Sequence, residues 1–162
     1  MKKRILIIMV IMMVASNAFA FFRMPDSGGG PMASAGFFLS SADTVDSGRG
    51  VRIGAEVSAF VFGWEGDFWG WFGIYSDFSF IQNGEISQGL ISLGPEIGMY
   101  FFGVDGGLLL YGNDKGKLSH GATVRIHISI PTFAKPFSSI SPFYRVNYFN
   151  KKDIRNEFGV LF

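Results

Sequence analysis

The segment Ala122-Thr123-Val124-Arg125-Ile126-His127-Ile128-Ser129-Ile130 decides the fold class, because its side chains alternate between two kinds. Val124 and the three isoleucines share one face, whereas Arg125, His127 and Ser129 share the other. Successive side chains of a β-strand point to opposite faces, while an amphipathic helix repeats apolar residues every three or four positions. The segment therefore predicts a β-strand with one apolar face and one polar face.

The same alternation recurs along the chain, separated by clusters of Gly, Asn, Asp and Pro. Every odd position from Val51 to Val61 is apolar, and Arg52, Glu56 and Ser58 occupy even positions between them. This pattern is typical of an all-β protein. We predict eight strands, at residues 33–41, 50–62, 67–81, 88–102, 105–111, 122–130, 138–149 and 154–162, with tight connections near 64–66, 103–105 and 131–136.

The N-terminus has the pattern of a secretory signal peptide. Lys2, Lys3 and Arg4 precede the uncharged apolar run 5–14, and Ala18-Phe19-Ala20 supplies a small-x-small cleavage site. We predict a signal peptide at residues 1–20, a flexible periplasmic segment at 21–32 with Ser27-Gly28-Gly29-Gly30-Pro31 at its centre, and one barrel domain at 33–162. The chain is therefore expected to be exported.

Charge and cysteine content exclude several function classes. The net charge of +1 comes from the leader, because removing its three basic residues leaves 11 basic against 13 acidic residues. The mature chain therefore gives no support to a nucleic-acid partner. The chain has no Cys, which excludes disulfides, a thiol nucleophile, thiolate metal sites and a lipid-modified N-terminal Cys. No motif indicates a cofactor or a metal.

The position of the lysines favours an apolar exterior over an apolar core. A soluble β-sandwich usually carries Lys on its outer strand faces. Here all the lysines after the leader fall in predicted connections: Lys115, Lys117, Lys135, Lys151 and Lys152. Exported strands that are apolar on one side, polar on the other and rich in aromatic residues match a transmembrane β-barrel with a polar lumen. Such a sheet has to close, because lipid offers no partners to backbone groups.

The C-terminal residues Ile154-Arg155-Asn156-Glu157-Phe158-Gly159-Val160-Leu161-Phe162 carry a family resemblance. They resemble the C-terminal assembly signal of bacterial outer-membrane barrels, with Phe158, Val160 and Phe162 at alternate positions and Asn156 as a departure. With eight strands, residues 33–162 are similar to the small barrels of the outer-membrane protein A and X type. This resemblance is architectural.

The resemblance implies an eight-stranded antiparallel up-and-down transmembrane β-barrel in the bacterial outer membrane. It also implies contact with outer-membrane lipid and lipopolysaccharide-like lipids, and recognition by the barrel-assembly machinery. We expect a monomer with no nucleic-acid partner and no cofactor. If both termini are periplasmic, the polar connections near 41–49, 82–87, 112–119 and 150–153 lie outside the cell.

Charged residues on the predicted strands form the main candidate site. An eight-stranded barrel has room inside for little more than side chains. Unpaired buried charges are costly, so we expect the luminal charges to pair and to plug the barrel. Alternation assigns eight residues to this luminal charge network: Arg52, Glu56, Asp77, Glu96, Arg125, Arg145, Arg155 and Glu157.

The sequence allows two arrangements for one of the predicted strands. In residues 67–81, the alternation that keeps Asp77 away from lipid also sends Trp69 and Trp71 inward. A bulge between Trp71 and Asp77 would instead place the tryptophans at the membrane interface. Both arrangements are compatible with the sequence.

His127 and Ser129 are the one His and hydroxyl pair that shares a strand face. The pair resembles the His-x-Ser of outer-membrane lipid A deacylases, but that family also needs a carboxylate shortly downstream, and none occurs between Ser129 and Asp153. We therefore expect a non-enzymatic barrel with a structural or surface-interaction role. The alternatives are a narrow channel or carrier for a small apolar solute, a lipid-modifying hydrolase, and a soluble periplasmic ligand-binding barrel with its apolar faces inward.

Overall fold

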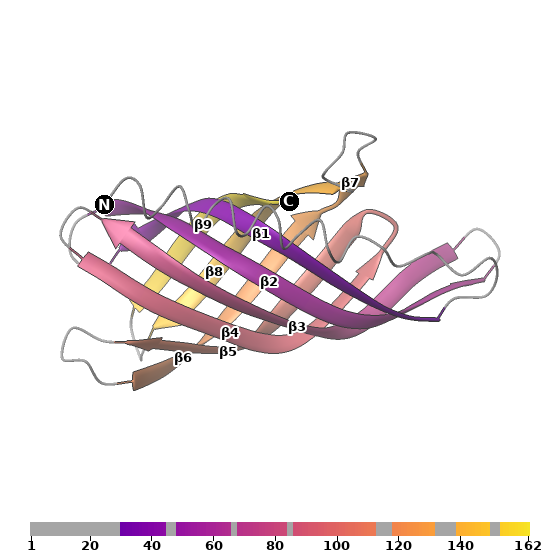
Figure 1. Ribbon diagram of the computed structural model, residues 1–162, viewed down its shortest axis with the longest axis horizontal. Coiled ribbons are helices and arrows are strands. Elements are labelled where there is room, and N and C mark those ends of the chain that lie inside the picture. Colours follow the sequence, from indigo (N-terminus) through magenta and orange to yellow (C-terminus); the bar gives the residue numbers. More distant parts are fainter. Residues whose placement is uncertain are drawn as a thin grey trace.

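The computed structural model describes residues 30–44, 48–65, 68–83, 86–112, 118–131, 139–149 and 153–162, and these residues form a β-barrel (Figure 1). No part of these ranges forms a helix long and apolar enough to cross a membrane. The strands are β1 (Gly30–Thr44), β2 (Gly48–Glu65), β3 (Phe68–Asn83), β4 (Ile86–Met99), β5 (Phe102–Gly112), β6 (Leu118–Ile128), β7 (Ile130–Pro131), β8 (Ser139–Phe149) and β9 (Asp153–Leu161).

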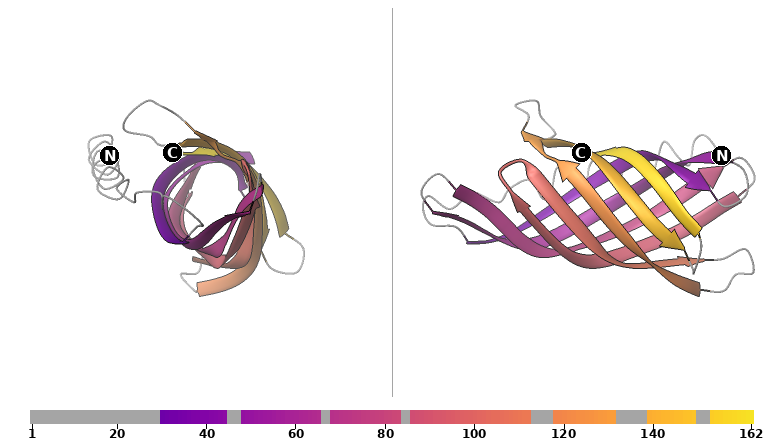
Figure 2. Two further views of the ribbon diagram at one scale, coloured as in Figure 1. Left: turned by 90° about the vertical axis from the view of Figure 1, so that its right-hand side faces the viewer. Right: turned by 180° about the vertical axis from the view of Figure 1, so that it is seen from behind.

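Each strand pairs antiparallel with its neighbours, and the sheet closes on itself. β1 pairs with β9, and β6 pairs with β8, so the ring is complete when it is viewed along its axis (Figure 2). The two-residue β7 continues β6 and pairs only with the start of β8. The predicted all-β, antiparallel, eight-stranded barrel is therefore confirmed.

The strands are staggered, which tilts them against the barrel axis. Following paired residues around the ring from Gly30 leads back to β1 at Ser40, ten residues further along the same strand. In a barrel of eight strands, such a stagger leaves an interior just wide enough for side chains to fill. The residues on this path are Gly30, Phe62, Trp71, Gly98, Gly103, His127, Phe143, Gly159 and Ser40.

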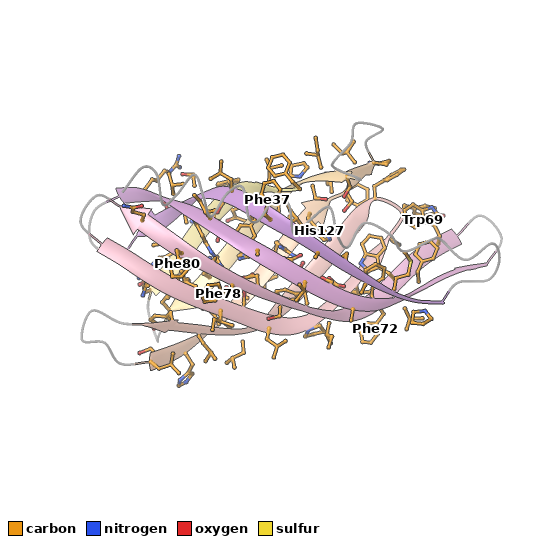
Figure 3. The ribbon with its side chains drawn as sticks, in the orientation of Figure 1. Phe37, Trp69, Phe72, Phe78, Phe80 and His127 are labelled. Carbon is orange, nitrogen blue, oxygen red and sulfur yellow. The ribbon has the colours of Figure 1, made fainter. Side chains whose placement is uncertain are left out.

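The apolar faces of the strands point outward. Val61 is 61% exposed and Phe72 is 62% exposed, whereas Arg125, on a polar face, is 1% exposed. Aromatic side chains project from the outer wall, with Phe72, Phe78 and Phe80 along β3 (Figure 3). A soluble ligand-binding barrel with an apolar interior would require the opposite orientation.

The observed strands correct two features of the sequence interpretation. The connection predicted at Gly103-Val104-Asp105 lies inside β5, and the chain turns instead at Tyr100 and Phe101. Tyr100 has a φ of 52°, a left-handed conformation that is uncommon outside Gly, Asn and Asp, so its side-chain type gave no turn signal. β1 also begins at Gly30, three residues before the predicted first strand.

The structure decides between the two arrangements that the sequence left for β3, since the strand has no bulge within its described residues. Its pairing with β2 and β4 is continuous, so Trp69 and Trp71 point inward on the same face as Asp77. The proposed signal peptide, most of the segment 21–32 and the five lysines lie outside the described residues.

Candidate functional site: the lumen

The barrel has two ends that differ in their interior. We call the end with the connections that follow β1, β3, β5 and β8 the loop end, and the opposite one the turn end. All eight residues of the luminal charge network lie buried inside, with exposures from 0 to 6%. Their partners divide them into two clusters and two separate residues.

The first cluster, nearer the loop end, is built on Arg52, Asp77, Arg145 and Glu157. Arg52 Nη1 lies 2.6 Å from Glu157 Oε2, and its Nη2 lies 3.0 Å from Asp77 Oδ1. Arg145 Nη2 lies 2.9 Å from Asp77 Oδ2. The four residues come from four different strands, so their ion pairs connect opposite walls of the barrel. Hydrogen bonds from neighbouring side chains complete the cluster: Ser40 and Asn147 donate to Glu157, Ser92 donates to Asp77, and Arg52 Nε donates to Ser79.

The second cluster consists of Arg125, Glu56 and Asp105. Arg125 Nη2 donates to Glu56 Oε1 at 2.9 Å, its Nη1 pairs with Glu56 Oε2, and its Nε lies 2.9 Å from Asp105 Oδ2. The guanidinium also lies over the rings of Tyr75 and Phe143, at 5.4 and 5.6 Å. Asp105 is absent from the predicted network, because the sequence interpretation placed it in a turn.

Arg155 and Glu96 stay apart from both clusters. Arg155 bonds to Asp153 at 2.6 Å and covers the ring of Phe149 at 3.9 Å, near the loop end. Glu96 has no ion pair with any described cation. Its Oε2 accepts a hydrogen bond from Ser58 at 3.1 Å, and its Oε1 has no partner within the described ranges. The structure therefore joins six of the eight predicted residues into ion pairs with each other or with Asp105.

An apolar layer closes the lumen above the first cluster. Six inward-facing residues at the loop end are 0 to 5% exposed and form one cluster, which consists of Ala42, Ile81, Leu90, Leu109, Tyr111 and Phe149. The rings of Tyr111 and Phe149 meet edge to face, with centroids 4.8 Å apart. This layer separates the two ion-pair clusters from the loop end. It escaped the sequence interpretation because the outer-face neighbours of Leu90 and Leu109, which are Ile91, Leu108 and Leu110, are apolar too.

His127 and Ser129 both face the lumen near the turn end, as alternation predicts. The Ser129 hydroxyl accepts a hydrogen bond from Ser141 at 3.0 Å. His127 Nδ1 has no hydrogen-bond partner among the described residues. The arrangement does not show the oriented His that activates a hydroxyl nucleophile. Among the described residues, no group of acidic, His or Cys side chains is arranged to hold a metal ion.

Comparisons with known proteins add no assignment to this geometry. No family model, curated protein or solved structure matches the chain.

The C-terminal residues complete the seam between β9 and β1. Phe162 and Phe37 exchange two backbone hydrogen bonds, with N···O distances of 2.8 and 3.1 Å. Their rings stack with centroids 5.2 Å apart. Phe158 is exposed on the outer wall, and Val160 and Phe162 are partly buried. Asn156, the departure from the apolar pattern, faces outward and accepts a hydrogen bond from the Tyr144 hydroxyl at 2.7 Å.

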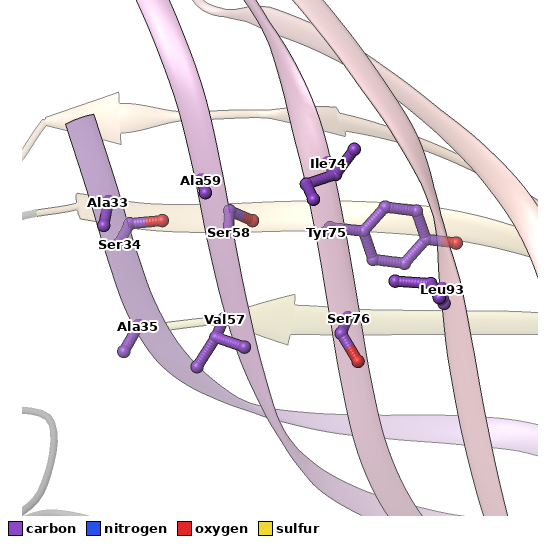
Figure 4. Close-up of a pocket in the computed structure, with 10 residues that line it drawn as sticks. All are labelled: Ala33, Ser34, Ala35, Val57, Ser58, Ala59, Ile74, Tyr75, Ser76 and Leu93. Carbon is purple, nitrogen blue, oxygen red and sulfur yellow. The ribbon is translucent and has the colours of Figure 1, made fainter. Parts of the chain in front are cut away.

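The outer wall has two shallow furrows where its side chains are small. One, of about 320 Å³, crosses β1 to β4 beside Ala33, Ala35 and Ala59 (Figure 4). The other, of about 510 Å³, crosses β4 to β6 beside Gly106 and Ala122. Both are lined mainly by apolar atoms, and the lining of the second also includes Glu96 and Asp105.

Proposed function

We propose that the chain is a non-enzymatic integral outer-membrane barrel with a structural or surface-interaction role and a lumen plugged by ion pairs. The observation that carries the proposal is the inverted distribution of polarity, with apolar side chains around the outside and paired charges at the centre. In this arrangement the turn end faces the periplasm and the loop end faces the outside of the cell.

The membrane location is supported by the cost of the outer surface in water. Burying apolar surface is worth about 25 cal/mol per Å², and here large apolar side chains stay exposed on every side of the barrel. Lipid removes that cost, and the closed ladder leaves no unpaired central edge for lipid to meet. The apolar exterior therefore favours a membrane over an aqueous compartment.

The plug is supported by the two clusters and the apolar layer above them. Arg52, Arg125 and Arg145 are each at most 1% exposed and reach acids on other strands, so their side chains fill the middle of the lumen. This arrangement favours a closed barrel over a water-filled channel. The hydrolase alternative has weaker support, because Ser129 bonds to Ser141 and no carboxylate in the described part of the chain bonds to Nδ1 of His127.

Folding into detergent tests the membrane proposal. We expect the mature protein to fold only with detergent or lipid, and to migrate faster in gel electrophoresis when it is not boiled, because a closed sheet resists mild detergent. A monomeric folded protein in plain buffer would contradict the membrane location. A retained residue 1–20 segment in envelope protein, seen by intact mass, would contradict export.

Planar-bilayer recording tests the plug. We expect the wild-type protein to show no large, steady conductance, because the ion pairs and the apolar layer occupy the lumen. A variant that thins the apolar layer, Leu109→Gly, serves as a comparison and is expected to show brief openings more often than the wild type. A steady open pore in the wild type would shift the function towards transport.

A further inference from the structure

The pairing around the barrel leaves one edge of β1 open towards the turn end. β1 pairs with β2 over its whole length, but on its other side β9 ends at Phe162, opposite Phe37. Figure 1 shows the C-terminus beside the middle of β1, which continues past it. Residues 30–36 therefore have no neighbouring strand on that side within the described ranges. We call this stretch the open edge.

Backbone groups of the open edge have no strand to bond with among the described residues. Phe37 and Phe162 exchange both of their backbone hydrogen bonds, so Phe37 directs its N–H and C=O groups towards β9. Every second residue of a strand has the same direction, so Ala33 and Ala35 direct theirs to the open side, and Pro31 adds a carbonyl. The adjoining outer wall is apolar, so in a bilayer these groups would meet lipid, which offers no hydrogen bonds. A strand laid along the open edge would satisfy them.

The segment that precedes β1 has the length and the loop residues to form that strand. Signal cleavage after Ala20 would leave residues 21–29 in front of β1. Ser27-Gly28-Gly29-Gly30 matches a four-residue hairpin loop, one of the common lengths, and its glycines accept the left-handed backbone that tight loops use. Residues 21–26 then lie opposite residues 31–36, six against six. We propose that in the mature protein residues 21–26 form a strand along the open edge, an inference that rests on the proposed export and membrane location.

The side chains of this strand match the faces that the pairing gives them. Residues directly opposite each other in an antiparallel pair share a face. Phe22 lies opposite Ala35 and Met24 opposite Ala33, so both apolar side chains point outward, at the margin of the furrow beside these small alanines (Figure 4). Pro25 directs its nitrogen away from β1, where no hydrogen bond is lost. The segment therefore continues the apolar outer wall.

Arg23 of this strand points into the lumen, where positive charge is lacking. It lies opposite Ser34, which is on the inward face of β1 and yet is exposed, so the described side chains leave space beside it. Arg155 pairs with Asp153. The other buried charges in the described part of the lumen are three arginines and five acids: Arg52, Arg125, Arg145, Glu56, Asp77, Glu96, Asp105 and Glu157. Arg23 reduces this excess of negative charge, because opposite charges attract across a medium of low dielectric without direct contact.

Disulfide formation tests the pairing, since the chain has no Cys of its own. Phe22→Cys combined with Ala35→Cys puts two thiols on opposite residues, whose Cα atoms lie about 5.5 Å apart, within the range that a disulfide spans. We expect a mild oxidant to close this bond in most of the mature protein after folding in detergent, as measured by intact mass. Phe22→Cys with Pro31→Cys is the matched control, because Pro31 lies four residues, about 13 Å, further along β1. We expect at least fivefold less disulfide in the control, whereas an unpaired segment would close this shorter loop at least as readily.

Lipid contact provides a second test that needs no disulfide. A fluorescent label is attached to a single Cys in Phe22→Cys, Arg23→Cys or Met24→Cys, in phosphatidylcholine vesicles with a fraction of brominated lipid, which quenches fluorophores that touch it. We expect quenching at positions 22 and 24 to be at least twofold stronger than at 23, because a strand turns alternate residues to the lipid. Equal quenching at the three positions, or equal disulfide yields in the two Cys pairs, would overturn the added strand.

Two controls separate this inference from the proposed function. Heat-dependent gel migration shows whether each variant has folded, and intact mass shows whether residues 1–20 have been removed. A folded, cleaved protein that fails either test overturns only the added strand. A protein that does not fold in detergent, or that keeps residues 1–20, overturns the membrane location or the export, and the added strand with it.

Discussion

Replacing Arg125 with alanine is expected to lower the free energy of unfolding of the barrel by roughly 3 to 5 kcal/mol. Arg125 is 1% exposed and its guanidinium bonds to both Glu56 and Asp105. Removing it leaves two buried carboxylates with no cation between them. It also leaves an empty space beside the rings of Tyr75 and Phe143, where the guanidinium lay. Urea unfolding followed by tryptophan fluorescence in lipid vesicles measures the change.

Two variants separate the buried pair from a general effect of lost charge. Arg49→Ala removes a solvent-exposed guanidinium that lies 3.7 Å from Asp43, so it should cost less than about 1 kcal/mol. Combining Arg125→Leu with Glu56→Gln and Asp105→Asn should recover most of the stability, because the second cluster then holds no unpaired charge. Equal losses for Arg125→Ala and Arg49→Ala would show that water reaches the second cluster.

Alternation alone was enough to predict the fold class and the direction of most luminal side chains. Val124 and Ile126 face outward and Arg125 faces inward because the side-chain period of a strand is two, and that period is visible in the sequence. The same rule places Arg52, Glu56 and Glu157 inside. Strand ends were less accurate, since β1 begins at Gly30 and the turn at Tyr100 has no glycine or proline to mark it.

Asp105 was missed for a reason that the sequence could have corrected. Gly103, Gly106 and Gly107 surround it, and such glycines favour a turn when they are read locally. An extended alternation starting at Val104 would have revealed the signal, because Asp105, Leu109 and Tyr111 share the inward face. The glycines instead reflect close contact, since a Cβ at Gly103 would collide with His127.

The pairing of charges could not be predicted, because it depends on the stagger of the closed sheet. Arg52 meets Glu157, 105 residues away in sequence, because closure brings β9 beside β1, next to β2. A different stagger would present the same side chains to other partners. That Glu96 has no ion pair among the described residues follows from the same geometry, so it was also beyond the sequence.

Deleting Phe162 is expected to destabilise the closed barrel by roughly 2 to 4 kcal/mol and to reduce the folded fraction strongly. The deletion removes both backbone hydrogen bonds to Phe37 and the stacked ring pair, each worth about 0.5 to 1.5 kcal/mol. These contacts lie at the end of the pairing between the first and last strands. Their loss therefore opens the closed sheet at a place where lipid would meet unpaired backbone groups. Heat-dependent gel migration after refolding measures the folded fraction.

Phe162→Ala separates the ring from the backbone, because alanine keeps both hydrogen bonds to Phe37 and loses the stacked ring. Phe162→Ala should lower the free energy of unfolding of the refolded barrel by about 1 kcal/mol, clearly less than the deletion does. In cells the order should differ if the assembly machinery reads the terminal aromatic side chain, because Phe162→Ala would then fail as completely as the deletion. Equal, small effects of both changes in refolding and in cells would mean that the seam closes without its last residue. The comparison therefore tests two roles of one residue, closing the sheet through its backbone and signalling assembly through its ring.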